Sequence, residues 1–120
     1  MLSASLFDAE EILEGLLPWV RCESPTSDVA GVNRMMDMAA AELRRLGAVV
    51  ERTPGRDGYG DIVIGRLGGG EPTNSAGIMI LSHLDTVHMP GTVDGPLPLR
   101  RDGDRYYGPG IYDMKGGVRI

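Results

Sequence analysis

Cysteine and lysine are nearly missing from this sequence, and the shortage of cysteine limits the chemistry that it can carry. Cys22 is the only cysteine among 120 residues, so an internal disulfide and a cysteine-rich metal site are both excluded. Any metal ion that binds this chain must therefore use nitrogen and oxygen ligands. Cys22 has no histidine near it in the sequence, because His83 and His88 lie far downstream. We interpret it as a buried or incidental thiol rather than a nucleophile.

Clusters of basic residues and long hydrophobic runs are also absent. The chain has 17 acidic and 12 basic residues, which give a formal net charge of −5, and no stretch concentrates arginine or lysine. Nucleic acid is therefore not an expected partner. No segment approaches the roughly 20 apolar residues that span a membrane, and the first residues lack the basic and then apolar pattern of a signal peptide. We expect a soluble, cytoplasmic protein without membrane contact.

An apolar content of 42% is high enough for a packed core, and the first half of the chain carries two helical patterns. Asp8 can cap a helix that has Glu11 as its third residue, and apolar residues recur at helical spacing from 12 to 20. After a turn and cap region at 22–28, a second apolar stripe, rich in methionine, extends from 32 to 46 and ends at Gly47. We assign these methionines to core packing rather than to a binding surface.

Three strands are predicted after the helices, at residues 48–52, 61–66 and 77–82. The third is a short apolar run, which is typical of a strand buried on both faces. The glycine-rich stretch 68–72 ends in Glu71-Pro72, where a phosphate-binding loop would continue with lysine and serine or threonine. We therefore interpret that stretch as a hairpin loop. Helices followed by strands of this kind indicate an α/β layer structure.

His83 and Asp85 come directly after the predicted buried strand, at its carboxyl end. Open α/β sheets bind ligands at that edge. Residues at alternate positions of an extended chain point to one side, so Asp85 can accept a hydrogen bond from one imidazole nitrogen while the other nitrogen faces a metal ion. Taken alone, the pair is more typical of a structural histidine whose ring is satisfied by a neighbouring acid.

A second candidate, Asp113, lies in a glycine-rich stretch at 108–117, after a predicted hairpin at 100–107. Its carboxylate can cap a helix that begins near Met114, and it can also bind a divalent ion or bridge two of them. These two interpretations are compatible. Lys115, the only lysine, is two residues away. We expect it to balance charge or to pack its aliphatic stem, rather than to form a Schiff base.

Together, the stretches Ser82–Val87 and, about thirty residues later, Tyr107–Gly117 resemble the paired metal motifs of the zinc-dependent exopeptidases and amidohydrolases. That family includes glutamate carboxypeptidase, aminoacylase, acetylornithine deacetylase and succinyl-diaminopimelate desuccinylase. The sequence around Asp113 is most similar to that of the glutamate carboxypeptidases. The resemblance implies two Zn²⁺ ions, with Co²⁺ or Mn²⁺ as possible substitutes. It implies that His83 binds one zinc and Asp113 bridges both, while Asp85 supports catalysis by orienting His83. It also implies a cis peptide bond between Asp113 and Met114.

The same resemblance implies that residues 1–120 form the N-terminal portion of a catalytic domain, with two helices packed on a mixed, largely parallel sheet. The complete enzyme would be a homodimer that cleaves the amide bond of a peptide or an N-acyl amino acid. The family's general base, its remaining metal ligands and its dimerisation domain have no counterpart in these residues, so we expect no appreciable hydrolysis by them alone. The alternatives are a truncated, catalytically inactive structural fragment and a different, metal-free α/β binding module. His88 lies outside the matching motif, and we interpret it as a loop residue.

Overall fold

The first helix begins where its capping residue predicts. In the computed structural model, which describes residues 7–68 and 77–120, helix α1 spans Ala9–Arg21. The Asp8 carboxylate accepts hydrogen bonds from the backbone nitrogens of Glu10 and Glu11, at 2.9 and 3.2 Å. These bonds satisfy two of the amide groups that a helix start leaves without partners. The predicted cap and helix are therefore confirmed.

The second helix, α2, spans Val29–Arg45 and follows the same logic. Asp28 caps it by accepting a hydrogen bond from the Gly31 nitrogen at 3.0 Å. Gly47, with φ of 85°, lies just past its end in the left-handed region that favours glycine. No helix in the part of the chain that the structure describes is long and apolar enough to cross a membrane.

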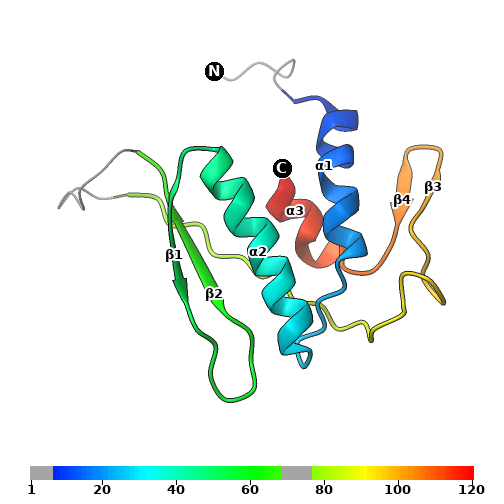
Figure 1. Cartoon of the computed structure of the whole chain (residues 1–120). Helices are drawn as coiled ribbons and strands as arrows, with labels where there is room; N and C mark the ends of the chain where they lie inside the picture. Colours follow the sequence, from blue (N-terminus) through cyan, green and yellow to red (C-terminus); the bar gives the residue numbers. More distant parts are fainter. Residues whose placement is uncertain (1–6, 69–76) are drawn as a thin grey trace.

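Two antiparallel hairpins flank the helices (Figure 1). Strand β1 (Val49–Thr53) pairs with β2 (Ile62–Arg66), and β3 (Arg100–Asp102) pairs with β4 (Arg105–Tyr107). After β4 comes an irregular helical turn, η2 (Ile111–Lys115), followed by the short helix α3 (Gly116–Arg119). The strands predicted at 48–52 and 61–66 and the hairpin predicted at 100–107 are confirmed. The last helix begins at Gly116, two residues later than expected.

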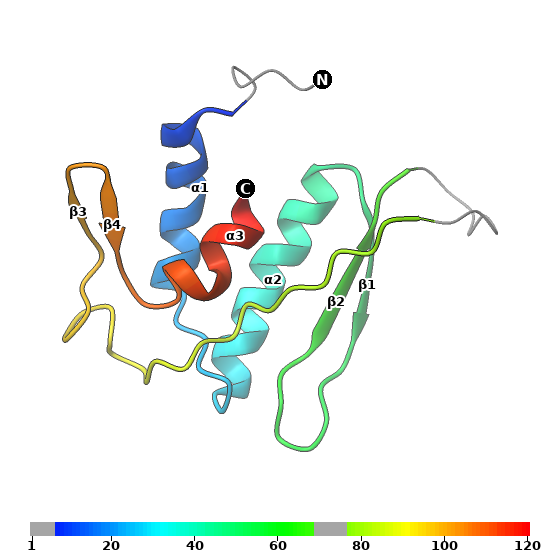
Figure 2. The ribbon, with the colours of Figure 1, turned by 180° about the vertical axis from the view of Figure 1, so that it is seen from behind.

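The predicted sheet arrangement is wrong. The pairings between named strands are antiparallel, and the parallel pairing among the described residues is an isolated bridge between Pro25 and Thr86. The run 77–82 forms no strand with the described residues, and the extended chain that carries it passes in front of β2 and α2 in the view of Figure 2. Ile78 is 96% exposed and Leu81 is 86% exposed. Burial on both faces requires neighbours on both edges and covering layers, which the described residues do not supply. The loop predicted at 68–72 lies largely outside those residues.

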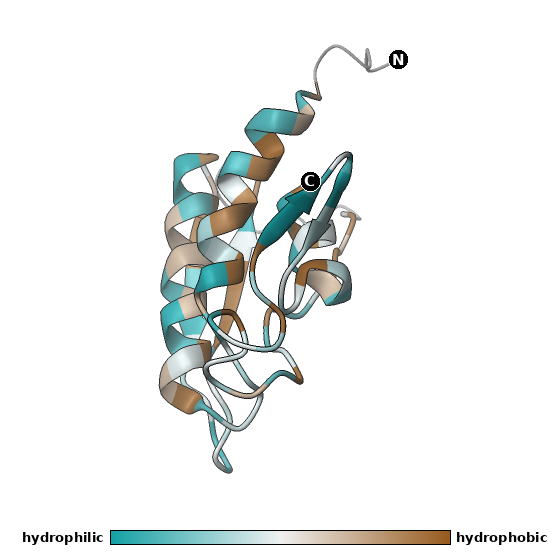
Figure 3. Ribbon diagram, turned by 90° about the vertical axis from the view of Figure 1, so that its right-hand side faces the viewer, coloured by the Kyte–Doolittle hydropathy of each residue, from teal (hydrophilic) through white to brown (hydrophobic). Residues whose placement is uncertain are grey.

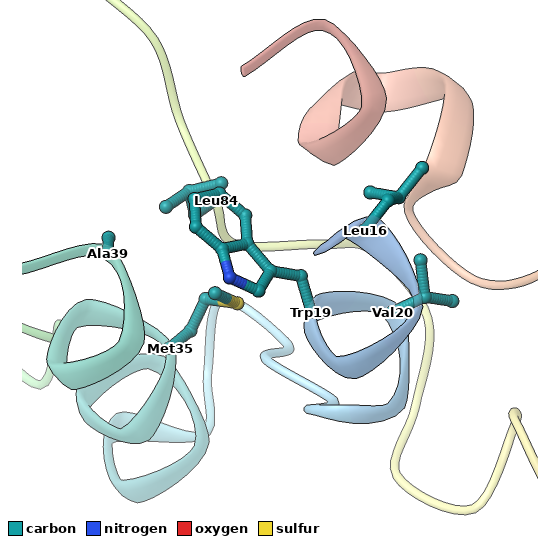
Figure 4. Packing of buried hydrophobic residues seen from close by; sticks show 6 residues of the cluster. All are labelled: Leu16, Trp19, Val20, Met35, Ala39 and Leu84. Carbon is teal, nitrogen blue, oxygen red and sulfur yellow. The ribbon is translucent and has the colours of Figure 1, made fainter. Parts of the chain in front are cut away.

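The core lies where α1, α2 and the chain just after residue 82 meet. Hydrophobic and hydrophilic residues alternate along each helix (Figure 3). Six buried apolar side chains pack together (Figure 4): Leu16, Trp19, Val20, Met35, Ala39 and Leu84. Met35 is fully buried, and Met36 and Met38 pack against the cluster. The methionine stripe therefore belongs to the core, as predicted. On its other sides, α1 packs against η2 and α3, and α2 packs against β1 and β2.

Charged side chains join α3 to α2 at the edge of this core. Arg119 Nη1 donates to Glu42 Oε1 at 2.5 Å, and Arg45 donates to both oxygens of the same carboxylate, at 2.7 and 3.0 Å. The hydrogen bond from Arg45 is the largest cause of a lowered pKa of Glu42. Burial opposes it, but the contacts with Arg119 add to it, and the pKa falls from 4.5 to about 2. The Glu42 carboxylate is therefore ionised in the folded chain at pH values where it is protonated in the unfolded chain.

We expect the stability that Glu42 contributes to be present above its unfolded pKa of 4.5 and to be lost as the pH falls toward about 2. Below pH 4.5 the unfolded chain binds the proton more readily than the folded chain does, so acid favours unfolding. Because the group is near the surface, the loss should be about 1 kcal/mol. Urea unfolding of the parent, Glu42→Gln and Glu14→Gln chains at neutral pH and at about pH 3 measures it. A decline in Glu42→Gln as steep as in the exposed-site control Glu14→Gln would contradict the assignment.

Candidate metal centre

His83, Asp85 and Asp113 lie together, although Asp113 is 30 residues away from His83 in the sequence. His83 Nε2 is 3.0 Å from Asp113 Oδ1. His83 Nδ1 is 3.1 Å from the Asp85 carbonyl oxygen and 3.3 Å from its Oδ1. The two ring nitrogens thus face different acids, and the backbone of Asp85 is at least as close to the ring as its carboxylate.

An open cleft of about 330 Å³ lies beside these three residues. This volume is at the lower end of the range for small-molecule sites. Its other lining residues come from the connection between α1 and α2, from the segment before β3 and from η2, and they include Thr26, Thr86, Val87, His88, Leu97 and Tyr112. Tyr112 is 99% exposed at its rim. His88, expected only as a loop residue, is part of the lining, which its position outside the matching motif did not indicate.

The segment that carries His83 and Asp85 is held by the connection between α1 and α2. The Thr86 nitrogen donates to the Ser24 carbonyl at 2.8 Å, and the Thr26 nitrogen donates to the Thr86 carbonyl at 3.0 Å. Ser24 is fully buried, and its hydroxyl donates to the Leu84 carbonyl at 2.7 Å. These bonds give an otherwise unpaired extended segment a fixed partner on one edge. The sequence placed Ser24 and Thr26 in a turn and cap region without a role at the site, and the succession of short hydroxyl residues there was the available signal.

Asp113 is held through its neighbour Lys115. The Lys115 side chain is 1% exposed, and Nζ donates to the carbonyl oxygens of Trp19 and Cys22 at 2.9 and 2.8 Å. These carbonyls lie at the end of α1, where helices leave acceptors without partners. Burial lowers the pKa of Lys115 from 10.5 to about 8. The peptide bond between Asp113 and Met114 is cis, as the family resemblance implies.

Close backbone packing brings the Asp113 turn up to the His83 segment. Gly110 has φ of 73°, and a Cβ atom placed on it would lie 2.5 Å from Cγ2 of Thr86. Any larger residue would push the two segments apart. The backbone nitrogen of Lys115 donates to the Gly110 carbonyl at 3.0 Å, and this bond closes the turn around Asp113. The glycine at this position thus allows a close approach of the two backbone segments.

The local charges suit a cation between His83 and Asp113. Partial burial alone would lower the pKa of His83, but hydrogen bonds to the Asp85 carbonyl and the Asp113 carboxylate outweigh it and raise the pKa above 6.5. Imidazole nitrogen and carboxylate oxygen are ligands that zinc accepts, and here one of each converges. Among the described residues, no group of three or more histidine, cysteine, aspartate or glutamate side chains is placed to hold a metal ion. The donors therefore fit part of a metal centre.

Residues 79–120, which include all three candidates, match the model of the peptidase family M20/M25/M40. Over its whole length the chain is also similar to "Carboxypeptidase G2" from Pseudomonas sp. (strain RS-16), with 32% identity. Both matches support a relation of this chain to peptidase family M20/M25/M40. The branch suggested by the residues around Asp113 agrees with this relative. The chain spans 28% of the relative's length.

Proposed function

We propose that this chain carries part of the metal centre of a hydrolase that cleaves an amide bond in a peptide or an N-acyl amino acid. The observation that carries the proposal is the approach of His83 Nε2 to Asp113 Oδ1, 3.0 Å apart beside an open cleft. The name of the relative, a carboxypeptidase, supports a substrate of the peptide class. The complete enzyme as a homodimer and its cytoplasmic location remain predictions from the sequence.

Each of the three residues has a distinct part in this proposal. His83 would bind one Zn²⁺ through Nε2, and Asp113 has two carboxylate oxygens with which to bridge two ions. Asp85 would hold the opposite ring nitrogen, which fixes the tautomer that leaves Nε2 free. Bound zinc supplies an activated water and polarises the scissile carbonyl. Co²⁺ or Mn²⁺ could take its place.

A proton carrier is the part that the described cleft does not provide. Its lining residues include His83, Asp85, Asp113 and His88, but no glutamate. The carboxylates and His83 are already engaged in the roles above, and no hydrogen bond or ion pair among the described residues holds the His88 ring toward the cleft. We therefore expect little amide hydrolysis by this chain alone. An inactive structural fragment is the alternative that this observation favours.

Zinc binding tests the proposal without requiring catalysis. Calorimetric titration of Zn²⁺ into the metal-free chain should show weak binding, because two protein ligands are fewer than the three or four usual for zinc. Asp113→Ala should lower the affinity about tenfold or more, since it removes a direct ligand. Asp94→Ala is the matched control, because Asp94 is an exposed carboxylate outside the cleft. Equal binding by the parent and the Asp113→Ala chain would rule out Asp113 as a ligand.

An activity assay of the native gene product then separates the enzyme from the inactive fragment. The test substrates are N-acyl-glutamates, a peptide whose C-terminal peptide bond can be cleaved, and N-acetylornithine. They represent the branches of the family that this sequence resembles. We expect cleavage of at least one amide that stops when a chelator removes the metal and returns when Zn²⁺ is added. Zinc binding without cleavage of any of them would favour the inactive fragment.

A further inference from the structure

We infer that Thr26 is a positioning residue of this centre, whose hydroxyl fixes the Asp85 carboxylate so that Asp85 can orient His83. The inference rests on the proposed function, because it concerns the geometry of the same metal site. Thr26 lies in the connection between α1 and α2, in a stretch without any candidate ligand. Its contribution is therefore indirect, through Asp85.

The two oxygens of the Asp85 carboxylate have separate partners. Thr26 Oγ1 donates to Oδ2 at 2.5 Å, and Oδ1 lies 3.3 Å from His83 Nδ1. Thr26 Oγ1 is also 3.4 Å from the Thr86 carbonyl, but its single proton favours the shorter bond to a charged acceptor. The hydroxyl thus occupies one carboxylate oxygen and leaves the other directed at the imidazole.

The Asp85 side chain needs such a restraint because it is not enclosed. One third of it, 33%, is exposed, and 47% of the His83 side chain is exposed. A carboxylate in that environment can exchange its protein partners for water and turn to other rotamers. The Thr26 hydroxyl is the one side-chain donor to Asp85, besides the His83 ring, among the described residues. Removing it should release the carboxylate.

Thr26 is itself held firmly enough to act as the restraint. Its nitrogen donates to the Thr86 carbonyl at 3.0 Å, and the following turn is closed by the Asp28 nitrogen on the Pro25 carbonyl at 2.8 Å. A β-branched side chain has few χ1 rotamers, so a fixed backbone also fixes the hydroxyl. The connection between the helices therefore transmits its position to His83 in three steps: Thr26, Asp85 and the ring.

Two substitutions separate the hydroxyl from the shape of the side chain. Thr26→Val keeps the branched shape and removes the donor, whereas Thr26→Ser keeps the donor. We expect Thr26→Val to raise the Kd for Zn²⁺ about threefold to tenfold, somewhat less than the loss of a group bonded directly to a ligand. Thr26→Ser should stay within about twofold of the parent chain. Urea unfolding of each variant shows whether the fold is retained.

A second measurement does not depend on zinc. In the metal-free chain, at a pH where the ring is neutral, the nitrogen NMR shifts of His83 report its tautomer. The Asp113 carboxylate lies 3.0 Å from Nε2 and would compete for the ring proton, so the comparison is made in chains that also carry Asp113→Ala. In that background, the chain with Thr26 and the Thr26→Ser chain should hold the proton on Nδ1, facing Asp85, and Thr26→Val should show a mixture. In an Asp85→Ala background, Thr26→Val should change neither the tautomer nor the zinc affinity further, because the residue through which Thr26 acts is gone.

The outcomes distinguish this inference from the proposed function. If the parent chain binds zinc but Thr26→Val matches it in affinity and tautomer, the role of Thr26 is overturned and the metal site stands. Equal losses in Thr26→Val and Thr26→Ser would overturn it too, since serine keeps the donor. If the parent chain does not bind zinc, the proposed function fails, and the His83 tautomer alone decides whether Thr26 positions Asp85.

Discussion

Replacing Lys115 with methionine is expected to lower the free energy of unfolding of this chain by about 2 kcal/mol. Methionine keeps most of the apolar stem, so the loss comes from the two hydrogen bonds that Nζ donates to Trp19 and Cys22. Their carbonyl oxygens lie beside a side chain that is 1% exposed, and water cannot readily replace the donor. Relief from burying an ammonium group offsets part of the loss, which is why we do not expect more.

The measurement is equilibrium unfolding in urea, followed by the circular dichroism of the helices. Arg44→Met is the matched control, because Arg44 is an exposed basic residue on α2. It should change the stability by less than about 0.5 kcal/mol. If both substitutions had the same small effect, Lys115 would not be joining α1 to the turn that carries Asp113.

The exposed apolar run 77–82 should make a solution of this chain associate with itself. Ile78, Met79, Ile80 and Leu81 are between 86% and 96% exposed. The run carries no charge and no proline, so neither of the usual devices that protect a strand edge is present. Pairing of two such runs would bury large side chains, each worth about 1.5–3 kcal/mol when removed from water.

Ile80→Lys should suppress this association, because it places a charge in the middle of the run. We expect the concentration at which oligomers form to rise about tenfold or more, which corresponds to one large apolar side chain no longer buried. Sedimentation velocity over a range of concentrations measures the change. Met89→Lys adds the same charge at another exposed apolar residue and should have little effect. A chain that stays monomeric without any substitution would contradict the prediction.

Local signals in the sequence were sufficient for the helices and the two hairpins. Asp8 and Asp28 cap their helices with side chains that bond only two or three residues ahead, and Gly47 ends α2 through its own backbone angle. Interactions of such short range are encoded in neighbouring residues, so periodicity and capping reveal them. His83, Asp85 and Asp113 became candidates through two short motifs that resemble those of a known family, and such motifs are also local in the sequence.

Long-range partners were beyond the reach of the sequence. The apolar run 77–82 indicates that its residues favour burial, but a pattern does not say which other segment would cover them. The hydrogen bonds of Thr26 to Asp85 and of Lys115 to Trp19 join residues that are 59 and 96 positions apart. Nothing in the local pattern of either end specifies the other, so the parallel sheet was wrong and the support of the site was missed.

The connection between α1 and α2 contacts both halves of the candidate centre, through Thr26 on one side and the Cys22 carbonyl on the other. The two proposed ligands, His83 and Asp113, therefore reach their positions only after three stretches of the chain have packed together: the connection between α1 and α2, the segment of His83 and the turn of Asp113. Residues 79–120, which match the family model, contain both ligands but lack the connection that aligns them. A peptide of that length would have the motif without its geometry, so the centre is a product of folding and is not contained in the motif itself.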